Sequence, residues 1–116
     1  VFYKLNERDA VVRQFKILIS VFSLKELVER VKEACSRIVL FGSSAQGTDA
    51  KHSDIDLFIL TSAKGPVRNA VSDFNRSSER KIAPIIVDAN EFVKLKRADR
   101  PLYENVERGI VLWERE

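Results

Sequence analysis

The pattern of apolar and polar positions along the chain predicts four short strands. Residues 37–41 are too apolar for a strand with one face in water, so we expect a buried strand there. Residues 54–60 begin with acids at alternate positions and continue as an apolar run, which predicts a second strand. Residues 82–87 predict a third strand, at an edge or irregular because Pro84 has no N–H to donate. Residues 110–113 predict a short fourth strand.

Two helices are expected before the first strand. Asn6, with Asp9 three positions later, has the spacing of a helix cap, and Ser23 with Glu26 has the spacing of a capping box for a second helix. Apolar residues recur at helical spacing after each cap, which predicts one buried face per helix. The residues expected to point inward are Val11, Phe15, Leu18, Ile19 and Phe22 in the first helix, and Leu24, Leu27, Val28, Val31 and Cys35 in the second.

Three further helices are expected between the later strands. Pro66 suits the first turn of one helix, and Asp88 with Glu91 has the spacing of a cap for the next. Pro101 begins the last helix and Gly109 ends it. This order of elements predicts an α/β (α+β) fold, with a small mixed sheet flanked by helices and two additional helices at the N-terminus.

Length and composition are those of one ordinary globular domain. The 116 residues are 45% hydrophobic and 32% charged, and no apolar run reaches the ~20 residues that cross a bilayer. We therefore expect a cytoplasmic protein with no membrane partner. The net charge of +3 suits an anionic ligand, but solvated lysines and arginines explain it equally well. The chain has one cysteine and no methionine, so we expect no internal disulfide and a start inside a longer protein or after processing.

The clearest chemistry lies where the first strand ends and the second begins. Asp54 and Asp56 are two positions apart, so in a strand their side chains share one face, with Cα atoms roughly 6.5–7 Å apart. Two carboxylates this close repel each other, and a hard cation such as Mg²⁺ offsets that repulsion. Gly42 lets a ligand approach the backbone, and Ser43 can bind phosphate through its hydroxyl and nearby amides. The alternative is a solvated turn followed by a strand with two edge acids.

This pattern resembles the nucleotidyltransferase superfamily that includes DNA polymerase beta, and especially the minimal nucleotidyltransferases of prokaryotes. The resemblance implies transfer of a nucleoside monophosphate from an NTP, expected to be ATP, to a hydroxyl. It also implies an acceptor that is a small molecule or a protein such as a HEPN-type toxin, and a separate acceptor subunit or a homodimer. The residues that carry the resemblance are Gly42-Ser43-Ser44-Ala45-Gln46-Gly47 and Ser53-Asp54-Ile55-Asp56-Leu57.

The resemblance also implies roles for individual residues. Gly42, Ser43 and Ser53 are expected to contact the nucleotide, with Ser53 bonding either its own loop or the phosphates. Asp54 and Asp56 are expected to be catalytic and to hold Mg²⁺, in a site that takes two ions in the active members of the superfamily.

The resemblance is incomplete at a third carboxylate. Active members carry it on a later strand, in a Val-Asp-Leu-Val type run, where it shares the second metal ion with the acidic pair. The corresponding run here is Pro84-Ile85-Ile86-Val87, which holds no acid. Asp88 is the candidate third catalytic residue, although its capping position already explains it. Two interpretations therefore stay open: an active nucleotidyltransferase, and a catalytically weakened nucleotide-binding or antitoxin module.

The N-terminal residues are expected to lie outside the catalytic domain. We assign residues 1–22 to an extension and residues 23–116 to the nucleotidyltransferase domain. The segment Val1-Phe2-Tyr3-Lys4-Leu5 resembles the wing strand of an upstream winged-helix domain, through which alone DNA would be contacted; a frayed terminus is the alternative. His52 is the only histidine, and we expect it to be exposed in its polar loop.

Overall fold

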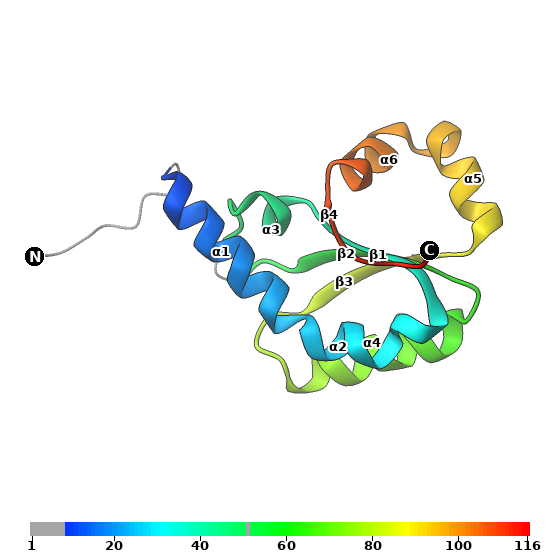
Figure 1. Cartoon of the computed structure of the whole chain (residues 1–116), viewed down its shortest axis with the longest axis horizontal. Coiled ribbons are helices and arrows are strands. Elements are labelled where there is room, and N and C mark those ends of the chain that lie inside the picture. Colours follow the sequence, from blue (N-terminus) through cyan, green and yellow to red (C-terminus); the bar gives the residue numbers. More distant parts are fainter. Residues whose placement is uncertain (1–8, 51) are drawn as a thin grey trace, which may run out of the picture.

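The computed structural model describes residues 9–50 and 52–116. Its centre is a mixed sheet of four strands in the spatial order β3-β2-β1-β4. Helices lie on both faces of this sheet (Figure 1). β1 pairs antiparallel with β2 and with β4, whereas β2 pairs parallel with β3. The strands are β1 (Cys35–Phe41), β2 (Ile55–Thr61), β3 (Ile82–Val87) and β4 (Ile110–Glu114). The predicted mixed α/β fold is confirmed, and Pro84 lies on an edge strand, as expected.

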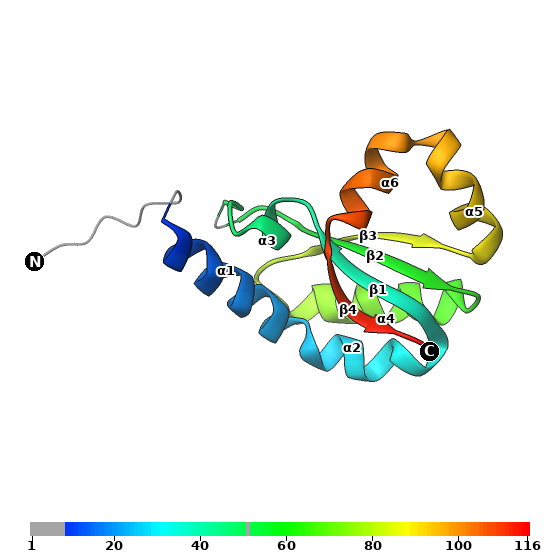
Figure 2. The ribbon, with the colours of Figure 1, turned by 45° about the horizontal axis from the view of Figure 1, so that its top comes forward.

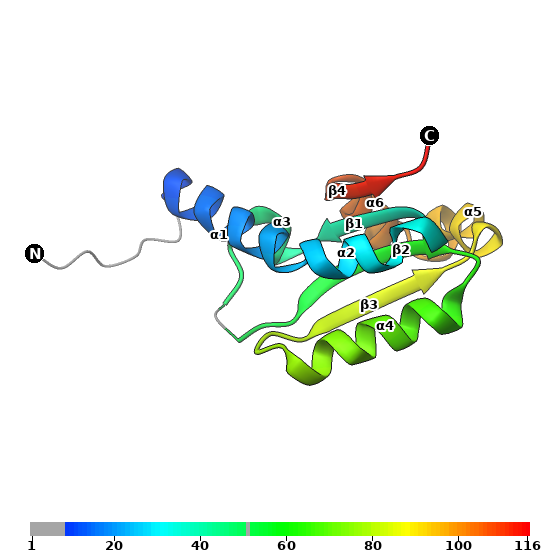
Figure 3. The same ribbon diagram turned by 60° about the horizontal axis from the view of Figure 1, so that its bottom comes forward.

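Among the described residues, the sheet is accompanied by α1 (Ala10–Ser23), α2 (Lys25–Val31), the 3₁₀ turn η1 (Lys32–Ala34), α3 (Ser43–Gln46), α4 (Lys64–Ser77), α5 (Ala89–Ala98) and α6 (Arg100–Glu107). Helices α2 and α4 cover one face of the sheet, and α5 and α6 cover the other (Figure 2). Helix α1 projects past the sheet and packs beside α3 (Figure 3). None of these helices is both long and apolar enough to span a bilayer.

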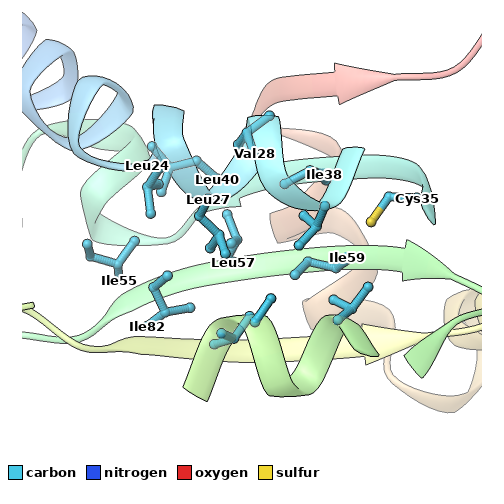
Figure 4. Close-up of a cluster of buried hydrophobic side chains, with 14 residues drawn as sticks. Leu24, Leu27, Val28, Cys35, Ile38, Leu40, Ile55, Leu57, Ile59 and Ile82 are labelled. Atoms are coloured by element: carbon cyan, nitrogen blue, oxygen red, sulfur yellow. The ribbon is translucent and has the colours of Figure 1, made fainter. Parts of the chain in front are cut away.

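Two apolar cores follow from the alternation of side chains along the strands. In β2, Ile55, Leu57 and Ile59 point toward α2 and α4, where the larger core lies (Figure 4). Phe58 is fully buried on the opposite face, in the core beneath α5 and α6. Asp56 lies on the same face as Phe58, because the two residues are separated by one position. The sheet thus presents the acidic face expected from the sequence on the α5–α6 side.

The apolar face of α1 points outward, contrary to the prediction. Its five large apolar side chains are 57–73% exposed, whereas Ser20 on the opposite side of the helix is only 3% exposed. Helical spacing correctly identifies an amphipathic helix. It does not say whether the apolar stripe meets this chain's own core, and here α1 lies beyond the sheet that would cover it. The exposed residues are Val11, Phe15, Leu18, Ile19 and Phe22.

The start of α2 also differs from the prediction. No side chain caps α2, and the Ser23 hydroxyl donates to the Ser20 carbonyl at 2.8 Å. The reason is that α1 continues almost directly into α2 through Leu24, which keeps helical backbone angles. Ser23 is therefore the last residue of a helix and does not have the extended backbone of an N-cap. The expected capping box with Glu26 does not form.

Helix α1 begins after Asp9, whose side chain accepts hydrogen bonds from the amides of Val11 and Val12. Asp9 is thus the N-cap that satisfies two of the first amides of the helix. Asn6, which was expected to share this role, and the segment Val1–Leu5 lie outside the described residues.

Polar replacements on the outer face of α1 are expected to leave stability nearly unchanged. Phe15 and Ile19 are already 62% and 57% exposed, and glutamine is a good helix former. The Phe15→Gln/Ile19→Gln variant should stay within about 0.5 kcal/mol of the wild-type free energy of unfolding, measured by urea denaturation at low protein concentration. Leu27→Ala, which opens a cavity at a residue 4% exposed, should lose about 3 kcal/mol as the matched core variant. Similar losses in both variants would contradict an exposed α1 face.

Candidate functional site

The bend after β1 brings a glycine against an acid of the neighbouring strand. Gly42 has φ 72° and ψ −153°, a backbone conformation that is essentially restricted to glycine. Phe41, just before it, is the pairing partner of Asp56 across the β1–β2 ladder. A Cβ atom built on Gly42 would lie 2.4 Å from Oδ2 of Asp56. The carboxylate therefore lies directly over the backbone of the bend, in space that any other residue at position 42 would fill.

The two acids of the second strand influence each other. Asp56 is partly buried in β2, whereas Asp54 precedes the strand and is exposed. Burial raises the pKa of the Asp56 carboxyl above its usual range, and the negative charge of Asp54 raises it further. This repulsion indicates that the two carboxylates lie near each other at the end of the sheet where Gly42 turns the chain.

A divalent cation fits this pair of carboxylates. Hard cations such as Mg²⁺ bind carboxylate and phosphate oxygens, and a cation between Asp54 and Asp56 would relieve the repulsion that raises the Asp56 pKa. Gly42 keeps the adjacent backbone free of a side chain. Residues 9–50 and 52–116 contain no group of three or more His, Cys, Asp or Glu side chains arranged to hold a metal ion. Among these residues, no third His, Cys, Asp or Glu side chain therefore joins the acidic pair in a metal-binding arrangement.

The sheet register locates the residue that flanks Asp56 on its other side. Ala83 of β3 is the parallel partner of Asp56, and neighbouring strands are roughly 4.8 Å apart, so a carboxylate at position 83 would lie beside Asp56. Asp88 lies at the opposite end of β3, about 16 Å farther along at the usual rise per residue. Its side chain accepts the Glu91 amide at 2.8 Å within the capping box of α5. The structure therefore does not bring Asp88 to the acidic pair, contrary to the expectation for a third catalytic residue.

The remaining residues expected at the site, Ser43 and Ser53, lie on α3 and in the loop before β2. Ser43 is the first residue of α3 and is partly buried. The Ser53 hydroxyl donates to the Ala50 carbonyl at 2.8 Å, which is the loop contact that was one of its two expected roles. His52 is exposed, as expected.

A buried ionic cluster next to the acidic pair was missed by the sequence analysis. Asp49 is only 3% exposed, and its Oδ2 lies 2.6 Å from Nη1 of Arg80. Nη2 of Arg80 donates to the hydroxyl of Ser44, which is also buried, at 3.1 Å. From the sequence, an acid in a polar loop such as Asp49 is expected to be exposed to solvent. Arg80 lies 31 positions later, so no short sequence pattern predicts that the two residues pair. Only the folded chain shows that they pair.

The raised pKa of Asp56 predicts a pH-dependent stability. The folded state holds the Asp56 proton more tightly than the unfolded chain does, so the stability that this proton contributes is present below the ordinary carboxyl pKa. It is lost as the pH rises through the raised folded-state pKa. Asp56→Asn removes this loss, so the variant should have a higher free energy of unfolding than the wild type at pH 7. This difference between variant and wild type should shrink at about pH 3, where the carboxyl group of Asp56 is protonated and therefore as neutral as the amide that replaces it. Urea denaturation at the two pH values checks this, and a variant less stable than the wild type at pH 7 contradicts it.

The chain is similar in fold to several solved structures. Among solved structures, it is similar to a Sulfolobus solfataricus protein assigned to the nucleotidyltransferases, with a TM-score of 0.59 and 23% identity over 95% of this chain and 94% of that chain. It is also similar to a mutant of the toxin–antitoxin MntA–HpeT, with a TM-score of 0.57 and 21% identity over 83% of this chain and 74% of that one. A toxin–antitoxin structure with AMP-PNP has a TM-score of 0.56 and 24% identity over the same shares, 83% and 74%.

These likenesses show the fold, and no curated protein matches the chain. The family described as "Polymerase beta, Nucleotidyltransferase" matches residues 23–116, which include the Gly42 bend and both acids. The chain therefore belongs to the polymerase beta family of nucleotidyltransferases.

Proposed function

We propose that the chain transfers a nucleoside monophosphate from an NTP to a hydroxyl group, with Asp54 and Asp56 holding Mg²⁺. The observation that carries the proposal is the contact between the Gly42 bend and the Asp56 carboxylate. This carboxylate oxygen, of the kind that Mg²⁺ prefers, lies directly over a backbone turn with no side chain, next to Ser43. In the proposed complex, the carboxylate binds the cation, and the turn with Ser43 binds the phosphates. Membership of the nucleotidyltransferase family supports the same reaction class.

The reaction can be written with its bonds balanced. The acceptor hydroxyl oxygen bonds to the α-phosphorus of the NTP, and the bond from that phosphorus to the α–β bridging oxygen breaks. Pyrophosphate leaves with the electron pair, and the hydroxyl proton passes to solvent. Gly42 leaves room for the Asp56 carboxylate, and Ser43 donates hydrogen bonds to the phosphates. Mg²⁺, when bound, supplies neutralising charge to the phosphate oxygens.

We propose ATP as the nucleotide and a protein hydroxyl as the acceptor. The similar toxin–antitoxin structure with AMP-PNP supports an adenine nucleotide, and the two toxin–antitoxin structures support a protein partner. We propose a HEPN-type toxin as that partner. The described residues fold into a single sheet with its helices, so the acceptor surface is proposed to come from that partner or from a second copy of the chain.

A second candidate function is nucleotide binding without transfer. The specific observation that favours it is Ala83, which occupies the strand position beside Asp56 and offers no metal ligand. A site with two carboxylates retains an attraction for Mg²⁺ and a triphosphate. A two-ion arrangement needs more oxygen ligands than this pair supplies. The chain would then act as a nucleotide-dependent antitoxin or regulatory module.

One experiment separates the two functions. The wild-type chain, Asp54→Asn and Asp56→Asn are incubated with ATP labelled on its α-phosphate, Mg²⁺ and a candidate protein partner, and both bound and transferred label are counted. Transfer by the wild type that disappears in both variants supports the enzyme. Mg²⁺-dependent binding without transfer supports the module. ATP binding that depends neither on Mg²⁺ nor on Asp54 and Asp56 would show that the nucleotide binds elsewhere, which contradicts the proposed site.

A further inference from the structure

The ionic cluster beside the site is built around a buried carboxylate with two cations. Asp49 follows α3 and is 3% exposed. Arg80 Nη1 lies 2.6 Å from its Oδ2, and Lys16 Nζ of α1 lies 3.8 Å from its Oδ1 and donates to its backbone carbonyl. Removing a carboxylate from water costs several kcal/mol, and the pairing with Arg80 and Lys16 offsets this cost. Asp49 therefore fixes the guanidinium of Arg80 at one place between α1, α3 and the segment that precedes β2.

The other N–H groups of Arg80 hold both sides of the candidate site. Nη2 donates to the Ser44 hydroxyl at 3.1 Å, and Ser44 directly follows the phosphate-binding candidate Ser43. Nε donates to the Ser53 carbonyl at 3.0 Å, and Nη2 also reaches the Ser53 hydroxyl at 3.4 Å. One side chain thus joins the helix after the Gly42 bend to the residue before Asp54. The planar fork of arginine makes these contacts together, which the single ammonium group of lysine does not.

The contact with Ser53 matters because Asp54 lies outside the β1–β2 ladder. The β1–β2 ladder ends at the pair of Phe41 and Asp56, so ladder hydrogen bonds do not fix the backbone of Asp54. The chain around Asp54 is held on one side by the bond from Arg80 to the Ser53 carbonyl, which belongs to the peptide unit joining Ser53 to Asp54. On the other side, the Ile55 amide donates to the Lys81 carbonyl at 2.9 Å.

We propose that Arg80, charge-paired with Asp49, is the positioning residue that aims the Asp54 carboxylate at the ion held by Asp56. This inference rests on the proposed function, because it assumes that the acidic pair binds a divalent cation. Arg80 touches neither nucleotide nor metal in this role; it acts through the Ser53–Asp54 peptide. Arg80 lies two positions before β3, so its bond to Ser53 also joins the start of the strand carrying Ala83 to the residue before Asp54.

The test uses Mn²⁺ as the probe and two mild substitutions in the whole chain. Arg80→Lys keeps a cation for Asp49 but loses the fork, and Asp49→Asn keeps the side-chain shape but removes the charge that fixes Arg80. Each should weaken Mn²⁺ binding, measured by electron paramagnetic resonance, by about tenfold, in the range found for residues that orient metal ligands. Amide hydrogen exchange at Asp54 and Ile55 should become faster in both variants. A merely structural role would change the unfolding midpoint without this local change.

A matched control is Arg76→Lys, since Arg76 is an exposed arginine of α4 that pairs with Asp73. It should bind Mn²⁺ as the wild type does. If Arg80→Lys and Asp49→Asn also bind like the wild type while Asp56→Asn does not, the role of Arg80 is wrong and the proposed function stands. If the wild type itself binds no Mn²⁺, both the proposed function and this inference are overturned.

Discussion

Replacing Gly42 by alanine is expected to abolish metal-dependent nucleotide binding and to destabilise the fold by about 3 kcal/mol or more. A Cβ atom at this position would lie 2.4 Å from Oδ2 of Asp56, so the carboxylate must leave its place over the bend. The backbone angles, φ 72° and ψ −153°, add strain for any residue with a side chain. The steric clash with the carboxylate and the backbone strain both arise at position 42, so nucleotide binding and stability should be lost together. Urea denaturation and calorimetric titration with Mg-ATP measure the two losses.

The matched control is Gly65→Ala in the first turn of α4. A Cβ there meets no other atom within 4 Å, and the residue is exposed in a helix. Alanine is the better helix former, but Pro66 follows this position and disfavours helical angles for a residue with a Cβ, so this variant should stay within about 1 kcal/mol of the wild-type free energy of unfolding and bind Mg-ATP unchanged. Similar behaviour of the two variants would show that the Asp56 carboxylate does not need the space above Gly42.

The parts of the site that could be predicted from the sequence are those that depend on short-range geometry. Alternation along one strand places Asp56 on the face of Phe58, and a glycine directly after a strand marks a close backbone approach. These relations hold within a few residues and survive in any fold that forms the strand. The pairing of Asp49 with Arg80 depends on which loop meets which, and this is decided by tertiary packing alone.

The same distinction explains the outcome for the helices. Leu27, Val28 and Val31 of α2 are buried as predicted, because that helix lies on the sheet and its apolar stripe meets the core. Cys35, expected at the end of the same helix, is also buried but belongs to β1, because the helix ends at Val31. The stripe of α1 has the same periodicity, but α1 extends beyond the sheet and is held by polar contacts of its inner side, such as Lys16 with Asp49. Periodicity therefore gives the direction of the stripe around the helix axis. The relation of the helix to the sheet needs the three-dimensional structure.

Asp88 shows why a missing ligand is hard to locate from sequence. The acid nearest to the third strand in sequence lies at its far end, where it caps α5, because strand residues advance by about 3.3 Å each. The parallel register makes Ala83 the neighbour of Asp56 and thus the position from which a third carboxylate would act. The choice between the proposed enzyme and the proposed binding module therefore depends on Ala83, whose methyl side chain cannot bind a metal ion.

Replacing Ala83 by aspartate is expected to raise the affinity for Mg²⁺ by tenfold to about a hundredfold. The new carboxylate would stand beside Asp56, because the two residues are parallel partners and Ala83 is only partly buried on an edge strand. Without a cation, the third negative charge raises the Asp56 pKa further and lowers stability at pH 7. Mg²⁺ should then raise the unfolding midpoint of this variant more than that of the wild type, since it binds only the folded arrangement.

Ala83→Asn is the matched control for this gain, because it has the same shape as aspartate and adds no charge. Its Mg²⁺ affinity should stay at the wild-type level, measured by titration calorimetry and by the shift of the unfolding midpoint with Mg²⁺. Equal affinities for the Asp and Asn variants would show that position 83 does not face the ion. Where the aspartate variant also transfers labelled nucleotide faster than the wild type, the absent carboxylate is the feature that limits the natural chain. Stronger binding with no transfer would place the limit at the acceptor, because the metal site would then be complete and only the hydroxyl to be modified would be lacking.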